Sequence, residues 1–398
     1  MAYSNAPWPF YSDEEREAVD RVLASGKVNY WTGTEGREFE KEFAEFTGVD
    51  HAIFVANGTL ALELGLRALN LPPGSDVVTT PRTYIASSSA IVAAGLRPVF
   101  ADVDRDSGNI TPDSVRDALT ANTSAVLVVH LGGWPADMPG FRGLCDERGL
   151  ALIEDCAQAH GAKIYGEHVG TFGDVAAWSF CQDKIITTGG EGGMVATNSA
   201  SLWNWMWSYK DHGKSWNAVY QREHGPGFRW FHESFGSNYR GTEMQAAIGR
   251  IQYRKLPDWH QQRTANAHTL AKSLEGVDGL RVPLPPDGYE HAFYRLYAYL
   301  DSALGADLMS RDRVIGRMSQ QFGVPGLSGS CSEIYREAAF AAADCSPRDR
   351  LSVAAELTDS AIAFLVHPGL GPDNMDQVAS AVDSSIADEL ERAHYSDN

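Results

Sequence analysis

Short apolar runs alternate with helical stretches along the chain from residue 52 to residue 197. The apolar runs are rich in β-branched residues and have the length of buried strands. Seven such runs are present, at residues 52–57, 77–81, 98–103, 125–130, 150–155, 175–180 and 194–197. Strand–helix alternation is typical of a mainly parallel sheet covered on both faces. The pattern predicts an α/β fold with its ligand site beyond the carboxyl ends of the strands.

Two amphipathic helices are expected before this region. The first should cover residues 12–25, because Ser12 can cap it, Glu15 follows three residues later and Gly26 can end it. The second follows a glycine-rich connector and carries aromatic residues at helical spacing, at Phe39, Phe43 and Phe46. Both helices therefore have one apolar face.

The pattern changes after the last predicted strand. Residues 200–237 contain five tryptophans and three histidines without a simple period, which indicates a long, partly structured excursion. A helix is expected over residues 242–256. Past Pro257 the chain shows helices and a few short strands, with a charged tail after about residue 385 that we expect to be solvated.

This change in pattern predicts two domains. A large domain should cover residues 1–256, and a smaller C-terminal α+β domain should cover residues 257–398. The length of 398 residues is ample for this division.

Composition excludes several classes of protein. The formal net charge of -19 disfavours nucleic-acid binding, and no apolar run reaches the roughly 18 residues of a membrane span. The five cysteines are widely spaced and form no CxxC pair, which argues against a disulfide framework or a zinc site. No secretory signal pattern opens the chain, so a cytoplasmic location is expected.

Polar residues follow three of the predicted strands. Asn57-Gly58-Thr59 lies between a strand and a helix, where N–H groups and a hydroxyl could bind phosphate, although an ordinary helix cap would use the same residues. Asp155 ends another strand. It could pair with the pyridine nitrogen of pyridoxal phosphate (PLP) or simply cap the next turn, and Gln158 lies within reach of the same ligand.

The third group follows the strand at residues 175–180. Ser179 could bind phosphate, and Lys184 lies five residues later, where it could form an imine with a carbonyl cofactor. A surface lysine would explain Lys184 alone. The glycines of residues 189–193 would let the backbone approach a bulky ligand, but they lack the spacing of a dinucleotide fingerprint. The combined spacing of the three groups is more specific than any one of them.

At this point the sequence strongly resembles the DegT/StrS-type sugar aminotransferases, a branch of the fold-type I PLP enzymes. The resemblance runs from about residue 7 to the late 370s. The stretches that carry it are NGTLAL (57–62), RPVFADVD (97–104), PADM (135–138), IEDCAQAHGA (153–162), VGTFGDVAAWSF (169–180), GGEGGMVATN (189–198) and NYRGTEMQAAIG (238–249). It implies a mainly parallel seven-stranded sheet in the large domain and a smaller C-terminal α+β domain.

The resemblance also implies roles for individual residues. Lys184 would be the Schiff-base lysine that also moves a proton, and Asp155 would pair with the pyridine nitrogen. Gln158 would lie near the 3-hydroxyl of the cofactor, and Tyr84 would stack on its ring. The phosphate would be bound by Gly58, Thr59 and Ser179, and by Asn238 from the neighbouring subunit, which implies a homodimer with shared active sites.

Substrate residues follow less directly from the resemblance. His212 and Tyr294 are candidates for contact with the acceptor, although packing or surface positions would explain both. Gly132 stands where the family often has tyrosine, which is expected to leave more room in the pocket. The excursion before Asn238 also looks longer than is usual in the family.

The leading hypothesis is transfer of an amino group from glutamate or glutamine to a keto-sugar. The acceptor expected from the resemblance is a nucleotide-linked sugar, for a natural product such as an antibiotic or for a surface polysaccharide. A keto-cyclitol or a keto-sugar of an aminoglycoside precursor is the alternative. A sugar dehydrase is disfavoured because its lysine would be histidine, and a non-catalytic PLP-binding regulator is disfavoured by the acidic charge. A metal hydrolase would need spacings such as HExxH, which are absent, and we expect no metal.

Overall fold

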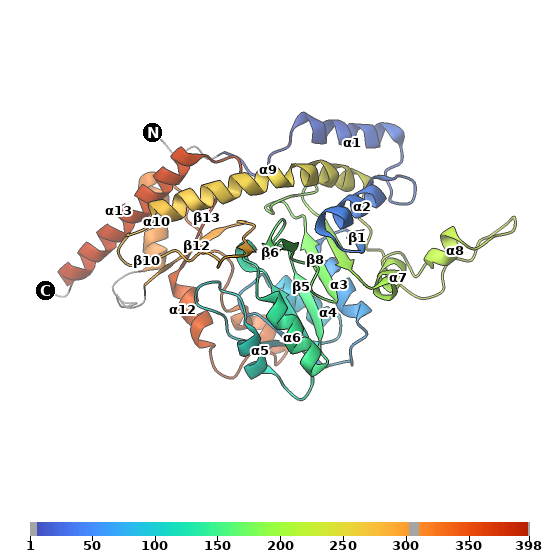
Figure 1. The fold of residues 1–398 in the computed structure, drawn as a ribbon, viewed down its shortest axis with the longest axis horizontal. Helices are drawn as coiled ribbons and strands as arrows, with labels where there is room; N and C mark the ends of the chain where they lie inside the picture. The colour runs from blue at the N-terminus through green and yellow to red at the C-terminus, as the bar shows by residue number, and fades with distance from the viewer. Residues whose placement is uncertain (1–5, 302–309, 397–398) are drawn as a thin grey trace.

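The computed structural model describes residues 6–301 and 310–396 (Figure 1). All seven predicted strands form one sheet in the order β1-β9-β8-β5-β4-β2-β3. Neighbouring strands are parallel except at β9, which is antiparallel to both of its neighbours. The strands are β1 (His51–Val55), β2 (Asp76–Thr79), β3 (Arg97–Phe100), β4 (Thr123–Val129), β5 (Ala151–Asp155), β8 (Val175–Ser179) and β9 (Gly193–Thr197). The predicted α/β class and the mainly parallel seven-stranded sheet are confirmed.

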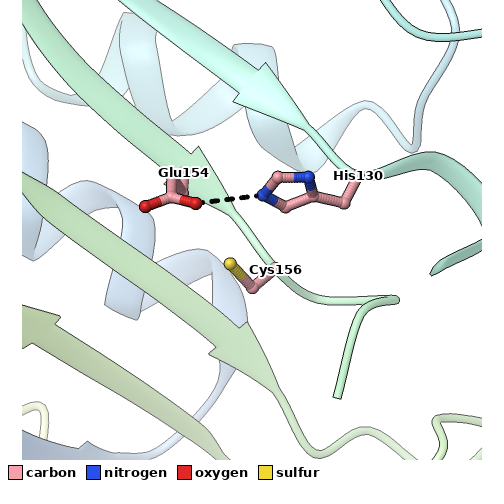
Figure 2. A group of neighbouring side chains, drawn as sticks. All are labelled: His130, Glu154 and Cys156. Atoms are coloured by element: carbon pink, nitrogen blue, oxygen red, sulfur yellow. Dashed lines mark hydrogen bonds and ion pairs between the residues drawn. The ribbon is translucent and has the colours of Figure 1, made fainter. Parts of the chain in front are cut away.

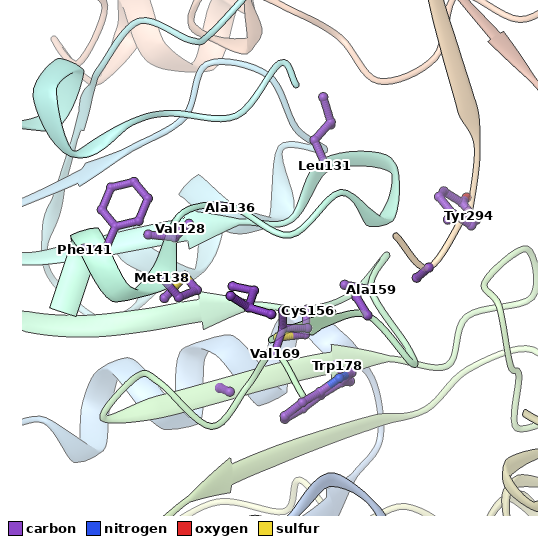
Figure 3. Close-up of a cluster of buried hydrophobic side chains, with 14 of the residues drawn as sticks. Val128, Leu131, Ala136, Met138, Phe141, Cys156, Ala159, Val169, Trp178 and Tyr294 are labelled. Carbon is purple, nitrogen blue, oxygen red and sulfur yellow. The ribbon is translucent and has the colours of Figure 1, made fainter. Parts of the chain in front are cut away.

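Helices cover both faces of this sheet because successive strand residues point to opposite sides. In β1, Ile53 and Val55 belong to one core and Phe54 belongs to the other. The first core includes residues of α3 (Gly58–Ala68), α4 (Ala86–Ala93) and α7 (Ala200–Tyr209). The second includes residues of α2 (Glu35–Thr47), α5 (Pro112–Ala118), α6 (Met138–Arg148) and α9 (Glu243–Ser273). Figure 3 shows part of this second core, where the labelled side chains extend from Phe141 to Trp178 and Tyr294.

The N-terminal helix forms as expected. It is α1 (Asp13–Ser25), with a capping box between Ser12 and Glu15 and a left-handed Gly26 after its last turn. The excursion contains α7 and a short α8 (Trp216–Tyr220), so it is partly helical. Figure 1 shows α8 and the hairpin beyond it projecting away from the sheet.

A second, smaller group of elements packs at the other end of the molecule. Its sheet has the order β10-β12-β13, and its core includes residues of α10 and α13 and of the second half of α9. These elements are β10 (Leu280–Arg281), β12 (Leu296–Leu300), β13 (Ala361–Phe364), α10 (Arg311–Phe322) and α13 (Pro372–Ser396). A third small sheet, β11-β6-β7, joins Tyr289–Glu290 to Lys163–Ile164 and Glu167–His168. The remaining short helices are η1 (Leu131–Gly133), η3 (Ile334–Arg336), α11 (Ala338–Ala342) and α12 (Ser352–Ser360).

Helix α9 connects these two groups, and it does not end where the sequence suggested. It continues through Pro257 to Ser273, so the domain boundary predicted at residue 257 falls inside a continuous helix. Proline removes one backbone hydrogen-bond donor from the helix. Helices α1, α2 and α13 pack along α9 and hold the parts of α9 before and after Pro257 together as one helix. In Figure 1, α2 lies near one end of α9, and α10 and α13 lie near the other.

The tail after residue 385 is also not simply solvated. Helix α13 continues to Ser396, and Ile386 and Glu389 are buried. Glu389 forms ion pairs with Arg313 and Arg317 of α10, which explains why a charged segment docks. Among the described residues, no helix has both the length and the apolar composition needed to span a membrane.

The first residue of α9 generates a prediction about stability. The buried Glu243 carboxylate accepts hydrogen bonds from the N–H groups of Glu35 (2.6 Å) and Gly36 (3.1 Å) in the first turn of α2. Glu243→Ala leaves these donors without an acceptor, so we expect a loss of about 1–3 kcal/mol of stability and a lower thermal midpoint. The exposed Glu17→Ala is the matched control and should leave the midpoint nearly unchanged. Equal midpoints for the two variants would contradict this account of the helix junction.

Candidate active site

A cavity of about 1030 Å³ opens at the carboxyl ends of β5 and β8. Its wall also includes Val129 at the end of β4, the start of α4 and a loop of the smaller group of elements at residues 327–331. The structure brings eight of the predicted site residues together here, at Gly58, Thr59, Tyr84, Asp155, Gln158, Ser179, Lys184 and Tyr294. The cofactor frame read from the sequence therefore surrounds one space.

One end of the cavity has the features of a phosphate site. Asn57 caps α3 by accepting a hydrogen bond from the N–H of Leu60 (2.9 Å), and Gly58 and Thr59 form the first turn. The early N–H groups of a helix have no acceptor within the helix, and they favour an anion. Ser179 lies beside them at the end of β8, and a Cβ on Gly58 would stand only 2.7 Å from the Ser179 Cβ. This close approach of backbone and hydroxyl fits a phosphate group.

Asp155 is the last residue of β5 and lines the same cavity. Its side chain is buried, and it accepts hydrogen bonds from the Ser87 hydroxyl (2.8 Å) and the Ala157 N–H (3.1 Å). Burial raises the pKa of Asp155, while these hydrogen bonds and the charge of Lys184 act in the opposite direction. A buried carboxylate is stabilised by a cation, and a protonated pyridine nitrogen is such a group. The donor set therefore fits PLP.

Gln158 forms the next part of the wall, and Gly132, which is not among the lining residues, holds its side chain. The Gln158 Oε1 atom accepts a hydrogen bond from the N–H of Gly132 (2.6 Å). Gly132 has φ +65°, and a Cβ there would lie 2.8 Å from Cε2 of Tyr297. The expectation that Gly132 leaves more room is wrong, because the Tyr297 ring from β12 already fills the space beside it.

Lys184 lies in the loop after β8 with its backbone held on both sides. Its N–H donates to the Cys181 carbonyl (3.1 Å), and its own carbonyl accepts from Trp8 Nε1 (2.9 Å). Its Nζ atom is 5.1 Å from the ring centroid of Tyr294. The Tyr294 hydroxyl donates a hydrogen bond to Asp183, and burial raises the pKa of Tyr294. Tyr294 therefore stands where it can meet both Lys184 and a substrate.

Two predicted residues lie elsewhere. His212 and Asn238 do not line the cavity described for this chain. They lie together at the base of the excursion, where the His212 N–H donates to the Ser237 carbonyl (2.8 Å) and Asp211 pairs with Asn238 in a β-bridge. The buried Asp211 holds this base through ion pairs with Arg240 and Lys214. Their roles in binding stay predictions.

Several site residues were missed in the sequence. Ser87 could have been found, because it lies three residues after Tyr84 and a helical turn brings such residues to one side. Asp183 and Arg295 also line the cavity, next to the predicted Lys184 and Tyr294. Nothing in the sequence signalled Trp8, which is 176 residues from its hydrogen-bond partner.

A cluster of buried polar side chains lies beneath the strand ends, as Figure 2 shows for His130, Glu154 and Cys156. The His130 Nδ1 atom accepts a hydrogen bond from the Ala136 N–H (3.0 Å), so Nε2 carries the proton that is shared with Glu154 (3.2 Å). Glu154 also accepts from three backbone N–H groups, at Gly170, Phe172 and Gly173. With both imidazole nitrogens engaged, this cluster acts as a structural clamp and not as a metal site.

Comparison with known proteins agrees with this geometry. The sequence profile of the DegT/DnrJ/EryC1/StrS aminotransferase family matches residues 10–383. A UDP-N-acetyl-3-dehydro-alpha-D-glucosamine 3-aminotransferase from Acidithiobacillus ferrooxidans is 38% identical over 73% of this chain and 74% of its own length. A dTDP-4-dehydro-2,3,6-trideoxy-D-glucose 4-aminotransferase from Saccharopolyspora spinosa is 38% identical over 73% of this chain and 76% of its own. The crystal structure of an aminotransferase from Psychrobacter cryohalolentis superposes with a TM-score of 0.93 at 50% identity, covering 96% of this chain and 98% of that one.

Replacement of Asp155 by Asn tests the buried carboxylate. Burial raises the pKa of Asp155, so the folded state favours the protonated side chain. The stability that this protonated form contributes is lost as the pH rises through the folded-state pKa. We expect D155N apoprotein to melt above wild-type apoprotein at pH 8, with the difference shrinking toward pH 4. Cofactor affinity should fall roughly 10- to 150-fold, the range for a lost hydrogen bond to a charged group. Unchanged cofactor affinity in a titration of the apoprotein would rule out the proposed pairing.

Replacement of Gly58 by Ala tests the phosphate end. The added Cβ would press on Ser179 and separate the two sides of the site, so we expect at least about tenfold weaker cofactor binding with the fold retained. Gly143→Ala in α6 is the control, because nothing lies within 4 Å of a Cβ there. That variant should bind the cofactor normally and gain up to about 1 kcal/mol of helix stability. Equal affinities for G58A and G143A would contradict the assignment.

Proposed function

The chain belongs to the DegT/DnrJ/EryC1/StrS aminotransferase family, and from this premise we propose that its acceptor is the ketone of a nucleotide-linked sugar. The enzyme is a PLP-dependent aminotransferase. The proposed amino donor is glutamate or glutamine, and the product would serve amino-sugar biosynthesis for an antibiotic or a surface polysaccharide. The observation that carries the proposal is the shared cavity of Asp155, Ser179 and Lys184.

The residues divide the work within this cavity. PLP, when bound, supplies an electron sink for the carbanion that forms at the substrate carbon. Asp155 would keep the ring nitrogen protonated, and Gly58, Thr59 and Ser179 would hold the phosphate. Lys184 would hold the cofactor covalently until the amine of the donor displaces it, and the freed Nζ amine would then carry the proton to and from the substrate carbon. Tyr294 and Tyr297 form the wall on the far side, where the acceptor would lie.

The size of the cavity supports a bulky acceptor. At about 1030 Å³ it lies at the upper end of the range for ligand sites, so it can hold a cofactor together with a sugar. Two of the relatives described above are named for UDP- and dTDP-linked sugars, which favours a nucleotide-linked acceptor over a keto-cyclitol. They are named for amination at different carbons, so the position aminated here is a matter for experiment.

We also propose a homodimer with shared active sites. His212 and Asn238 lie outside the cavity of their own chain, at the base of an excursion that projects from the molecule. A partner subunit could receive both residues, with Asn238 at the phosphate and His212 near the acceptor. A cytoplasmic location is proposed as well, supported by five cysteines that form no disulfide.

Lys184→Ala tests the reaction. Transfer from glutamate or glutamine to UDP- and dTDP-linked 3-keto and 4-keto sugars would be followed by mass spectrometry of the amino sugar. We expect wild-type protein to aminate at least one of these sugars and K184A to lose roughly 10²- to 10⁴-fold or more, because the proton carrier is gone. The exposed Lys41→Ala is the control and should keep full activity. Unchanged transfer by K184A, or wild-type activity confined to a keto-cyclitol, would contradict the proposal.

A further inference from the structure

The N-terminal segment reaches the back of Lys184 from a distant part of the chain. Trp8 Nε1 donates a hydrogen bond of 2.9 Å to the Lys184 carbonyl. Two residues later the Phe10 carbonyl accepts from Gln252 Nε2 of α9 (3.2 Å), which holds the segment along that helix. Trp8 is not among the described residues that line the cavity, so it acts on Lys184 from behind.

The indole ring of Trp8 is held by three side chains. The Arg263 guanidinium lies 4.8 Å from the ring centroid, and Trp259 meets the ring edge-on at 5.1 Å. These two residues are four apart on α9 and share one face of the helix. On another side the His367 imidazole stacks at 5.6 Å with the planes 24° apart. Burial lowers the pKa of His367 to about 4, so a neutral ring makes this contact at neutral pH.

His367 belongs to the smaller group of elements, just after β13, and its backbone is fixed. The buried Asn266 of α9 donates to the carbonyls of Val366 (3.3 Å), His367 (3.3 Å) and Leu370 (3.1 Å). Trp8 therefore joins two parts of the molecule, since its ring contacts the smaller group and its N–H contacts the loop that follows β8. A shift of one against the other would break the stack or the hydrogen bond.

The hydrogen bond from Trp8 affects the direction of the Lys184 side chain. The Lys184 N–H is held by the Cys181 carbonyl and its carbonyl by Trp8, so the peptide groups on both sides of its Cα are fixed. With both peptide planes fixed, the Cα–Cβ bond has one direction. Loss of the Trp8 bond frees the second plane, and the path of Nζ between cofactor and substrate carbon becomes less well defined.

We propose that Trp8 is a positioning residue for Lys184. Through Trp8, the position of the smaller group of elements relative to the sheet sets the direction of the lysine side chain. This inference rests on one part of the proposed function, the half-reaction with the amino donor, in which Lys184 moves the proton. It does not depend on the identity of the acceptor.

Trp8→Phe is the main test, because it keeps a ring against Arg263 and His367 and removes the N–H. In holoenzyme mixed with glutamate or glutamine, we expect the single-turnover rate to fall about tenfold with the half-saturating donor concentration unchanged. The visible circular dichroism of the bound cofactor should change, and its dissociation constant, measured by titration of the apoprotein, should rise severalfold. Trp205→Phe is the matched control, because Trp205 is 40% exposed, stacks on Tyr209 and does not line the cavity, so it should leave all three quantities near the wild-type values.

The outcomes separate this inference from the proposed function. W8F values equal to those of wild type, or equal to those of W205F, would overturn it. A wild-type enzyme that converts the donor but aminates no keto-sugar would refute the proposed acceptor and leave the Trp8 test intact. Should W8F fail to fold, replacement of Trp8 by 3-benzothienylalanine keeps the shape of the indole without its N–H, and wild-type rates and dichroism in that protein would overturn the inference.

Discussion

Burial of the Asp155 carboxylate at the end of β5 is the constraint around which the site is built. A carboxylate without a cation is costly in such a place, and within the described part of the chain Asp155 accepts hydrogen bonds from Ser87 and Ala157. A cationic ring nitrogen completes the set. Because β5 and β8 are neighbouring parallel strands, their carboxyl ends bring Ser179 and the following Lys184 to the same edge. The proposed anchors for the ring, the phosphate and the aldehyde carbon then lie around one cavity.

Glu154, one residue earlier, shows the contrast between a structural and a functional carboxylate. Strand alternation turns it to the opposite side, where three backbone N–H groups and His130 saturate its oxygens. Nothing is left for a ligand. Asp155 has fewer partners and faces a cavity. The two adjacent acids of β5 thus have different functions. Glu154 holds the end of the strand rigid, so that Asp155 stays in place.

The sequence was informative wherever the signal was local. Strand length and β-branching marked all seven strands, Ser12 and Glu15 marked the start of α1, and motif spacing together with the family resemblance marked the eight residues that share the cavity. It failed where distant residues decide. The helix runs through Pro257 because three helices pack along it, and Tyr297 fills the space beside Gly132 from a strand 165 residues away. Trp8 belongs to the same class, since no spacing rule connects it to Lys184.

Reaction type and acceptor choice rest on different parts of the chain. The residues proposed to hold and use the cofactor come from the strand ends, whose geometry the sheet fixes. The residues expected to meet the acceptor come from β12, from the loop at residues 327–331 and from the base of the excursion, which are connected to the sheet by longer paths. Loops of this kind can change without disturbing Asp155 or Lys184. A single frame can therefore serve different sugars, and in the proposed function the acceptor would be selected by the wall that Tyr294 and Tyr297 present, together with the residues that the proposed partner subunit would add.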